Sequence, residues 1–421
     1  MATAVLPAPG KPAPSDDKPA HFPMRKRTGT AHRRLLSHQV DIGLDDLAAL
    51  SPVETIQFMA EARWGSSTFI TCPHCGTMDE HYWSHKERRW KCCGCGWRFS
   101  VTSGTPYADH KLDLNKILRM MCSWGQPAAG RAATDIRKEN RISYRSAYVH
   151  GMKAREGLMR GHNVGLLCGI QEMDGLDLNG KRHKEKRNKP QSGGRLKAGE
   201  KPKIPAALLA TAVDQETGEI MGPPKPFKHD KTSKQPADRR LLLVMRQRGL
   251  LKRGGAIHTR VCIALKEVSA TVIKMAQRFS SAESRFMTDE DPAYFKFGKL
   301  FEKHDTVNHS EAYAKPGGIN NNQAESFNKR MRRCVEQIHL TVSNKYLADY
   351  ACEVAWREDL REPSTGKRLK ELLRTVLNVG LSQWWRGYWQ GQYREYEVLI
   401  EGDQEAAASG KAPGARPKPP R

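Results

Sequence analysis

Two cysteine pairs, Cys72-Pro-His-Cys75 and Cys92-Cys-Gly-Cys95, decide the fold of the N-terminal part of this chain. Sixteen residues separate the pairs, a spacing typical of a zinc ribbon. Each Cys-x-x-Cys turn supplies two thiolates, and structural Zn²⁺ takes four such ligands in a tetrahedron. We therefore predict one structural Zn²⁺ bound by Cys72, Cys75, Cys92 and Cys95, with Cys93 left as a spare thiol.

Two other interpretations of this region are open: a histidine replaces one thiolate, or the cysteines are buried or joined in disulfides. The candidate histidines are His74, His81 and His85. The chain has ten cysteines, and those outside the two pairs are scattered, as in proteins of a reducing compartment. No apolar run approaches the roughly 18 residues of a membrane span, and the N-terminus lacks the apolar core of a signal peptide. We expect a cytoplasmic protein without a membrane segment.

The chain is strongly basic, with 70 Lys and Arg against 46 Asp and Glu and a formal net charge of +24. Such a charge favours a polyanionic partner, most simply nucleic acid. Around the second cysteine pair, cations alternate with Trp90 and Trp97, and we predict DNA contact through Arg88, Arg89, Lys91 and Arg98. The alternative is that the tryptophans pack inside a small domain with the cations solvated around it.

Helical patterns flank the cysteines. Ser51 is predicted to begin a helix, with Glu54 completing a capping box. Further helices are predicted over Leu112–Trp124, over Ala128–Arg137 and from Ser143 onward. The last two, joined by Lys138–Ile142, resemble a helix-turn-helix whose later helix enters a major groove through Tyr144 and Arg145. The alternative is an ordinary helical linker with basic exposed faces.

From about Gly169 the sequence changes to short β-prone runs. Strands are predicted over Ile170–Leu178, Pro205–Val213, Arg260–Leu265 and Ser284–Thr288, and helices over Ser269–Arg278, Asn322–Gln337 and Val342–Glu358. Mixed strands followed by helices predict an α+β or α/β core. The basic, Gly- and Pro-containing segments near 181–203 and 222–256 are predicted to be surface insertions.

Three acidic residues lie in contexts that suit metal-dependent phosphodiester chemistry. Such chemistry uses two divalent cations about 4 Å apart, and Mg²⁺ takes carboxylate oxygens as protein ligands. Asp174 lies in a β-prone run, Asp289 ends an apolar run where a strand terminus would project it into a crevice, and Glu325 opens a helix. Thirty-five residues separate Asp289 from Glu325, a spacing similar to that of the DDE recombinases.

Each acid also has a non-catalytic interpretation. The competing arrangements are a capping box of Asn322 with Glu325, a solvated acidic turn of Asp289, Glu290 and Asp291, and an inward position taken by Glu172 or Asp177 in place of Asp174.

Two further groups of side chains are assigned provisional roles. Lys329, Arg332 and Arg333 share the helix face of Glu325, where they either hold substrate phosphates or form an ion-pairing stripe. Aromatic residues near the C-terminus follow near-helical spacing, and we predict a packing or oligomer face in preference to base stacking. These residues are Trp384, Trp385, Tyr388, Trp389 and Tyr393.

Several motifs follow one another between about residues 50 and 360. The first is Arg89 to Thr105 in the ribbon, and the second is Glu172-Met-Asp174-Gly175 with Asn179-Gly-Lys after it. The third is Thr288-Asp289-Glu290, which is followed by Tyr294 and by Val307–Ser310. The fourth runs from Asn320 to Phe327 and precedes a helix that contains Tyr350, Glu353 and Arg357. Together they resemble the ISXO2-like group of prokaryotic insertion-sequence DDE transposases, which carry an N-terminal zinc ribbon. The departures are Gly175 for that group's Glu, Asn320 for its His, Asp359 for its usual Asn, and the basic segment 222–256.

The resemblance implies a multidomain α+β protein, with a zinc ribbon and helix-turn-helix before an RNase H-like α/β catalytic core. It implies a DNA transposase, acting as a homo-oligomer on double-stranded DNA, that binds terminal repeats and catalyses Mg²⁺- or Mn²⁺-dependent strand cleavage and transfer. Asp174 would bridge two metal ions, and Asp289 and Glu325 would each complete one. The alternatives are a nuclease of the same fold that cuts without joining, and a non-catalytic DNA-binding regulator derived from a transposase.

The expected division of the chain follows from these patterns. It comprises a disordered basic tail over 1–33, a helix and zinc ribbon over 34–110, a helix-turn-helix region over 111–165, the catalytic domain with its basic insertions over 166–362, a helical aromatic region over 363–400 and a disordered tail over 401–421.

Overall fold

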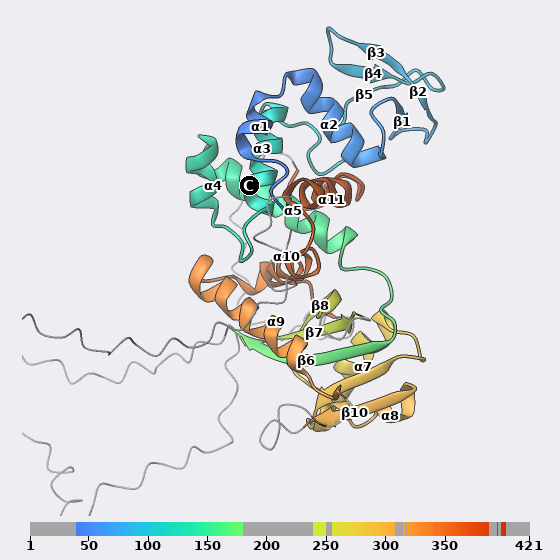
Figure 1. Ribbon diagram of the computed structural model, residues 1–421, viewed down its shortest axis with the longest axis vertical. Coiled ribbons are helices and arrows are strands. Elements are labelled where there is room, and N and C mark those ends of the chain that lie inside the picture. Colours follow the sequence, from blue (N-terminus) through green and yellow to red (C-terminus); the bar gives the residue numbers. More distant parts are fainter. Residues whose placement is uncertain are drawn as a thin grey trace, which may run out of the picture.

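The computed structural model describes residues 39–179, 239–249, 255–307, 315, 318–386, 394 and 397–400. Figure 1 shows two lobes, one helical with a small β-structured tip and the other built on a five-stranded sheet. Several predictions lie outside the described residues. These are the tails 1–33 and 401–421, the insertion 181–203, the strand Pro205–Val213, and the placement of Tyr388, Trp389 and Tyr393.

The chain enters the helical lobe through α1 (Leu44–Ala49) and α2 (Pro52–Trp64). The predicted capping box of α2 is confirmed: the Ser51 N–H donates to Glu54 Oε2 at 2.7 Å, and the Glu54 N–H donates to Ser51 Oγ at 3.3 Å. The helix ends at Gly65, whose φ of +81° is a left-handed conformation that glycine adopts without a steric penalty.

The β-structured tip consists of two small antiparallel sheets. One pairs β1 (Phe69–Thr71) with β2 (Met78–Glu80), and the other joins β3 (Tyr82–Ser84), β4 (Arg89–Lys91) and β5 (Arg98–Phe99). Trp90 and Phe99 lie edge-on to Trp64 of α2, with ring centroids 5.8 and 6.3 Å apart. The tip is therefore attached to α2 through aromatic contacts.

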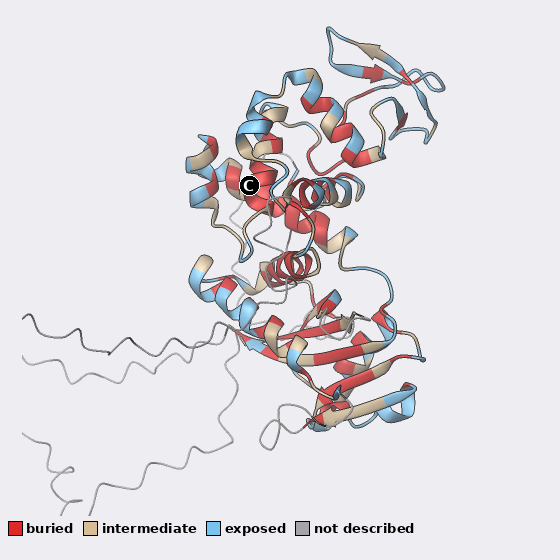
Figure 2. Cartoon of the chain, viewed as in Figure 1, coloured by how far each residue is buried: buried red, intermediate tan, exposed pale blue. Residues whose placement is uncertain are grey.

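Three helices complete this lobe: α3 (Leu114–Gly125), α4 (Ala133–Asn140) and α5 (Tyr144–Gly161). α4 begins five residues later than predicted, and α5 begins after Ser143, whose Oγ accepts from the Ser146 N–H at 3.1 Å. The side chains from Ala147 to Leu158 of α5 are buried or nearly so, and the first turn of the helix is exposed (Figure 2). No helix within the described ranges is both long and apolar enough to span a membrane.

The second lobe contains a five-stranded mixed sheet in the order β10-β9-β6-β7-β8. β7 is antiparallel to both β6 and β8, whereas β9 and β10 run parallel to β6. The strands are β6 (Ile170–Leu178), β7 (Arg240–Arg248), β8 (Ala256–Ala264), β9 (Arg285–Asp289) and β10 (Lys303–Val307). The predicted mixture of helices and strands is confirmed, and β6 has the predicted bounds.

The prediction of a surface insertion over 222–256 is wrong for β7. Leu241 to Met245 are at most 2% exposed, at the centre of the sheet. A strand covered on both faces appears in a sequence as a continuous apolar run without alternation, and here the run is short and flanked by arginines. Those arginines are themselves paired: Arg240 donates to Glu397 at 2.6 Å, and the buried Arg246 donates to the Gln323 carbonyl at 2.9 Å.

Helices cover both faces of the sheet. On one face lie α9 (Asn322–Arg333), with a π-helical turn over Cys334–Ile338, and α10 (Leu347–Asp359), which follows a 3₁₀ turn over Asn344–Tyr346. On the other lie α7 (Ser269–Phe279), a 3₁₀ turn over Pro292–Tyr294 and α8 (Phe297–Leu300). Successive β6 side chains alternate between these faces, with Met173 in the core under α7 and Leu176 in the core under α9.

After the sheet lobe the chain returns to the helical lobe. α11 (Thr365–Leu377) packs against α2, α3 and α5. Gly157 of α5 permits this approach, because a Cβ there would lie 2.8 Å from Val376 Cγ1. The predicted helical aromatic region is wrong at Trp384 and Trp385, which lie in irregular structure. Trp385 is nevertheless 2% exposed and packs against Tyr148 and Tyr346, so a packing role is correct for this residue.

A buried ion cluster joins the lobes. Glu353 of α10 accepts from Arg155 Nε of α5 at 2.6 Å and from Arg357 at 2.7 and 2.9 Å. Arg357 also donates to the carbonyls of Trp124 and Gly125, at the end of α3, at 2.6 and 3.1 Å. Burial by itself would raise the pKa of Glu353, but the two arginines lower it to about 2.

We predict that Glu353→Gln destabilises the protein by about 3–5 kcal/mol, because two buried arginines lose their counter-charge. The lowered pKa of Glu353 means that its contribution is complete above the ordinary pKa near 4.5 and is lost as the pH falls towards 2. Chemical denaturation between pH 3 and pH 7 should therefore show a smaller pH dependence in the variant. Glu371→Gln, at a half-buried residue whose ion pair is with Arg374 on the same helix, serves as control. Equal stabilities of the two variants would contradict the prediction.

Candidate functional site

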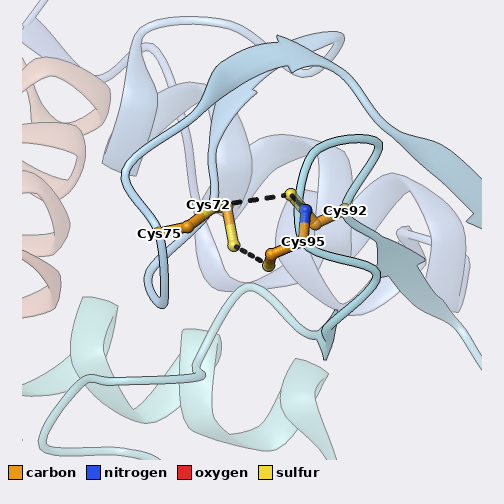
Figure 3. A group of neighbouring side chains, drawn as sticks. All are labelled: Cys72, Cys75, Cys92 and Cys95. Atoms are coloured by element: carbon orange, nitrogen blue, oxygen red, sulfur yellow. Dashed lines mark hydrogen bonds between the residues drawn. The ribbon is translucent and has the colours of Figure 1, made fainter.

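The four paired cysteines converge on one point in the tip (Figure 3). One Sγ atom from each of Cys72, Cys75, Cys92 and Cys95 lies within 4.8 Å of all the others. The two turns have the same geometry: the Gly76 N–H donates to the Cys72 carbonyl at 2.9 Å, and the Gly96 N–H donates to the Cys92 carbonyl at 3.0 Å. This arrangement fits the tetrahedral thiolate site of structural Zn²⁺.

The candidate replacement ligands lie outside this cluster. His81 Nδ1 is 3.3 Å from Sγ of the spare Cys93, and the His74 ring stacks on Trp97 with centroids 5.4 Å apart. His85 Nδ1 accepts from Trp83. In the described part of the chain every cysteine is a free thiol. Four thiolates therefore complete the site without a histidine or a disulfide.

The cations predicted to contact DNA surround the tip. Arg88, Arg89, Lys91 and Arg98 are all exposed, and Arg98 donates to Glu87 at 2.7 Å. The two interleaved tryptophans differ, since Trp90 is 6% exposed and belongs to the core, whereas Trp97 is 39% exposed. Packing is therefore correct for Trp90, and the exposed cations remain available to a partner.

Two adjoining clefts run from the tip to the start of α5. The first, of about 840 Å³, is bordered by Arg88, Arg89 and Arg98. The second, of about 1070 Å³, is bordered by Ser143, Arg145 and Lys153, and both clefts share Asp109, His110 and Arg386. Tyr144, which lies between Ser143 and Arg145 in the chain, is 50% exposed. The basic residues of the ribbon and of the first turn of α5 thus border a continuous surface.

The three predicted acids come from three elements of the sheet lobe. Asp174 lies in the middle of β6, Asp289 is the last residue of β9, and Glu325 lies in the first turn of α9. Burial and the negative charges of Asp289, Glu267 and Glu325 together raise the pKa of Asp174 to about 7. Asp174 accepts from Asn328 Nδ2 of α9 at 2.8 Å. The fold therefore brings the three acids into electrostatic contact.

The capping interpretation of Glu325 is wrong. α9 begins at Asn322 with Asn321 as its N-cap, so Glu325 is its fourth residue and the Asn322–Glu325 capping box does not form. Glu172 of β6 caps the helix in its place, because its Oε2 accepts from the Gln323 and Ala324 N–H groups at 2.6 and 3.2 Å.

The competing acids on β6 have other partners. Glu172 is fully buried, and its Oε1 accepts from Arg248 Nε at 2.5 Å. Asp177 is exposed and pairs with Arg239. Asp174 is therefore the β6 acid that faces Asp289 and Glu325.

Asp289, Glu290 and Asp291 do not form the solvated acidic turn of the alternative interpretation, because each has a different partner. Asp291 caps the 3₁₀ turn by accepting from the Ala293 N–H at 2.8 Å, and its own N–H donates to Asp289 Oδ1 at 3.3 Å. Glu290 is exposed, 3.8 Å from Lys315 Nζ. Of these three acids, Asp289 is the one whose charge raises the pKa of Asp174.

The departures from the ISXO2-like pattern have local explanations. Asn320 Oδ1 accepts from Arg248 at 2.7 Å, and Asp359 accepts from the Thr259 N–H at 2.8 Å, so both side chains tie loops or helices to the sheet. Gly175 leaves room for the carboxylate of Glu267, which lies beside it.

Sequence reasoning missed Asn328 and Glu267 as neighbours of Asp174. Neither residue lies at a spacing that relates it to β6, and their proximity arises from packing between distant segments.

The cations of α9 line its exposed side. Lys329 is 70% exposed with its Nζ 3.8 Å from Glu325, and Arg332 and Arg333 are exposed. An ion pair is thus present at Lys329, although its distance and exposure make it weak.

Comparison with known protein families gives two matches. Residues 52–98 match the transposase zinc-ribbon domain, and residues 215–359 match the ISXO2-like transposase domain. The second match contains Asp289 and Glu325, and Asp174 lies before it. No curated protein and no solved structure matches the chain. The resemblance predicted from the sequence is confirmed for the ribbon and for the DDE domain.

We predict that the full-length protein binds one zinc ion per chain and that Cys72→Ser/Cys75→Ser loses it, because each thiolate supplies a quarter of the coordination shell. Metal analysis by mass spectrometry measures the stoichiometry. Cys93→Ser, which changes the neighbouring spare thiol, should retain the zinc. Stoichiometric zinc in the double variant would contradict the assignment.

Proposed function

We propose that this protein is a DNA transposase that binds the ends of its element and catalyses metal-dependent strand cleavage and strand transfer. The observation that carries the proposal is the meeting of Asp174, Asp289 and Glu325 from β6, β9 and α9, in a chain with transposase zinc-ribbon and DDE domain matches.

The sheet topology supports an RNase H-like catalytic core. Three consecutive antiparallel strands, β6 to β8, are followed by β9 and β10, which add in parallel on the other side of β6. This order places β6 at the centre, with the end of β9 beside Asp174. The helix carrying Glu325 then covers the same face.

The donor set suits a hard divalent cation. Carboxylate oxygens are the ligands that Mg²⁺ and Mn²⁺ prefer, and among the described residues no cationic side chain pairs with Asp174. A buried carboxylate among other carboxylates is stabilised when a cation offsets the repulsion. Bound to Asp174, Asp289 and Glu325, such cations would activate the attacking oxygen and stabilise the leaving oxygen of a phosphodiester.

The surrounding residues position these acids and the DNA. Asn328 orients the Asp174 carboxylate, and Glu172 fixes the start of α9 and with it Glu325. Lys329, Arg332 and Arg333 extend along the exposed side of the same helix, where they hold substrate phosphates. Their positive charge attracts the polyanion without adding sequence preference.

Recognition of the element ends is assigned to the helical lobe. The ribbon cations Arg88, Arg89, Lys91 and Arg98 contact the backbone, and the exposed first turn of α5, with Tyr144 and Arg145, enters the major groove as the later helix of a helix-turn-helix. We further propose that a homo-oligomer holds two ends together, because transposition joins both ends of one element to a target.

Strand-transfer assays separate this proposal from its alternatives. Labelled element ends, a target plasmid and Mg²⁺ or Mn²⁺ should give joined products. Cut products without joining would indicate a nuclease, and bound but uncut DNA would indicate a non-catalytic regulator.

We predict that Glu325→Gln abolishes strand cleavage and leaves end binding and the melting temperature unchanged. Gln keeps the shape of the side chain and removes the negative charge that divalent cations require. Glu336→Gln, an exposed acid in the π turn that follows α9, is the matched control and should cleave normally. Cleavage by Glu325→Gln at the wild-type rate would exclude Glu325 from the catalytic set.

We predict that Arg88→Ala/Arg89→Ala/Arg145→Ala weakens binding to element ends and lowers the salt dependence, by about 0.9 in the log–log slope for each DNA phosphate that the variant no longer neutralises. The contact surface is tested with point variants and not by deleting residues 1–165. Such a deletion would remove α5, which packs into the sheet lobe, and would therefore unfold the core. Lys274→Ala/Lys296→Ala/Lys299→Ala, at exposed residues on or beside α7 and α8, removes the same number of charges and serves as control. Equal effects of the two sets would contradict a specific contact surface.

A further inference from the structure

Glu267 lies directly beside Gly175, in the middle of β6. A Cβ atom on Gly175 would lie 2.5 Å from Oε2, 2.6 Å from Oε1 and 2.7 Å from Cδ of Glu267. A real Cβ atom essentially never approaches another heavy atom this closely, so the carboxylate occupies the space that a residue other than glycine would fill. Glu267 itself comes from the loop between β8 and α7.

The carboxylate is held in this position by Tyr294. The Tyr294 hydroxyl donates to Glu267 Oε1 at 2.6 Å, and the tyrosine is fully buried in the 3₁₀ turn that follows Asp289. Among the described residues, the Tyr294 hydroxyl is the one hydrogen-bond donor to Glu267, and no cationic side chain pairs with Glu267. A partly buried carboxylate is therefore fixed in place while its charge stays uncompensated.

The position of Glu267 relates it to the acidic site. Because adjacent residues of a strand point to opposite faces, Glu267 approaches Gly175 from the α7 side, whereas Asp174 faces α9. Burial raises the pKa of Glu267, and Asp289 and Asp291 raise it further. Glu267 in turn is among the acids that raise the pKa of Asp174. Glu267 and Asp174 thus lie on opposite faces of β6, and the charge of Glu267 acts on Asp174 across the strand.

We propose that Glu267 is a fourth acidic residue of the Asp174, Asp289 and Glu325 site, a positioning residue whose charge strengthens divalent-cation binding there. Gly175 provides the space for its carboxylate and Tyr294 fixes its orientation. This inference rests on the proposed function, since it assumes that the three acids bind a divalent cation.

Titration of the full-length protein with Mn²⁺, followed by the electron paramagnetic resonance signal of the free ion, tests the proposal without relying on catalysis. Glu267→Gln keeps the side-chain shape and should weaken Mn²⁺ binding by at least about tenfold, the effect expected for one charge near a divalent cation at intermediate dielectric. Strand cleavage should decrease in parallel at limiting Mn²⁺ and recover at high Mn²⁺. A merely structural glutamate would not give this metal-dependent recovery.

A second set of variants uses the contact with Gly175. A methyl group in Gly175→Ala displaces the carboxylate, so this variant should weaken Mn²⁺ binding as Glu267→Ala does. In the Glu267→Ala background the methyl group has space, and Gly175→Ala should add no further loss. If Gly175→Ala weakened Mn²⁺ binding as much in the Glu267→Ala background as it does in the wild-type protein, the proposal would be overturned.

Asp289→Asn separates failure of this inference from failure of the proposed function. If Asp289→Asn weakens Mn²⁺ binding and abolishes cleavage while Glu267→Gln keeps wild-type affinity, the role of Glu267 is overturned and the proposed function stands. If neither variant changes Mn²⁺ binding, both proposals are overturned.

Discussion

The ion cluster of Arg155, Glu353 and Arg357 is the interaction on which the arrangement of the two lobes depends. It joins α5 of the helical lobe to α10 of the sheet lobe, and through the carbonyls of Trp124 and Gly125 it also fixes the end of α3. Burying three charges is favourable only when each is fully paired and hydrogen-bonded. The cluster therefore specifies one relative placement of the lobes, since any displacement would leave a buried charge without its partner.

This placement matters because α5 belongs to both lobes. Its exposed first turn lies beside the clefts that lead to the ribbon, and its buried residues Val149 and Met152 pack in the core that covers the sheet. α10 lies in the same core and contacts both β8 and α9. The helix that carries Glu325 and the surface proposed to bind DNA ends are thus connected through α5 and α10.

At the proposed metal site, the buried acids Glu172 and Asp174 of β6 have different partners. Arg248 neutralises Glu172, whose second oxygen caps α9, so this buried acid positions a helix. Asp174, in contrast, has amide and N–H partners and three acidic neighbours. The ribbon is likewise held by a small number of specific contacts. Its aromatic residues attach it to α2, while the four cysteines bring its two turns to one site that fits Zn²⁺.

The sequence by itself determined the features that depend on local spacing. The cysteine pairs, the Ser51–Glu54 capping box, the bounds of β6 and α7 and the ordered transposase motifs could all be recognised, because each involves residues a few positions apart or a pattern of fixed length. Only the tertiary structure decided the rest. The arginines that flank the apolar run of β7 make its sequence resemble a polar insertion. In the fold, Arg240 pairs with Glu397 and Arg246 donates to the Gln323 carbonyl, so the strand can lie at the centre of the sheet. The capping of α9 by Glu172, the contact of Glu267 with Gly175 and the burial of Trp385 join segments tens to hundreds of residues apart. No local rule encodes such contacts, because they arise when the two faces of one sheet are covered by helices from different parts of the chain.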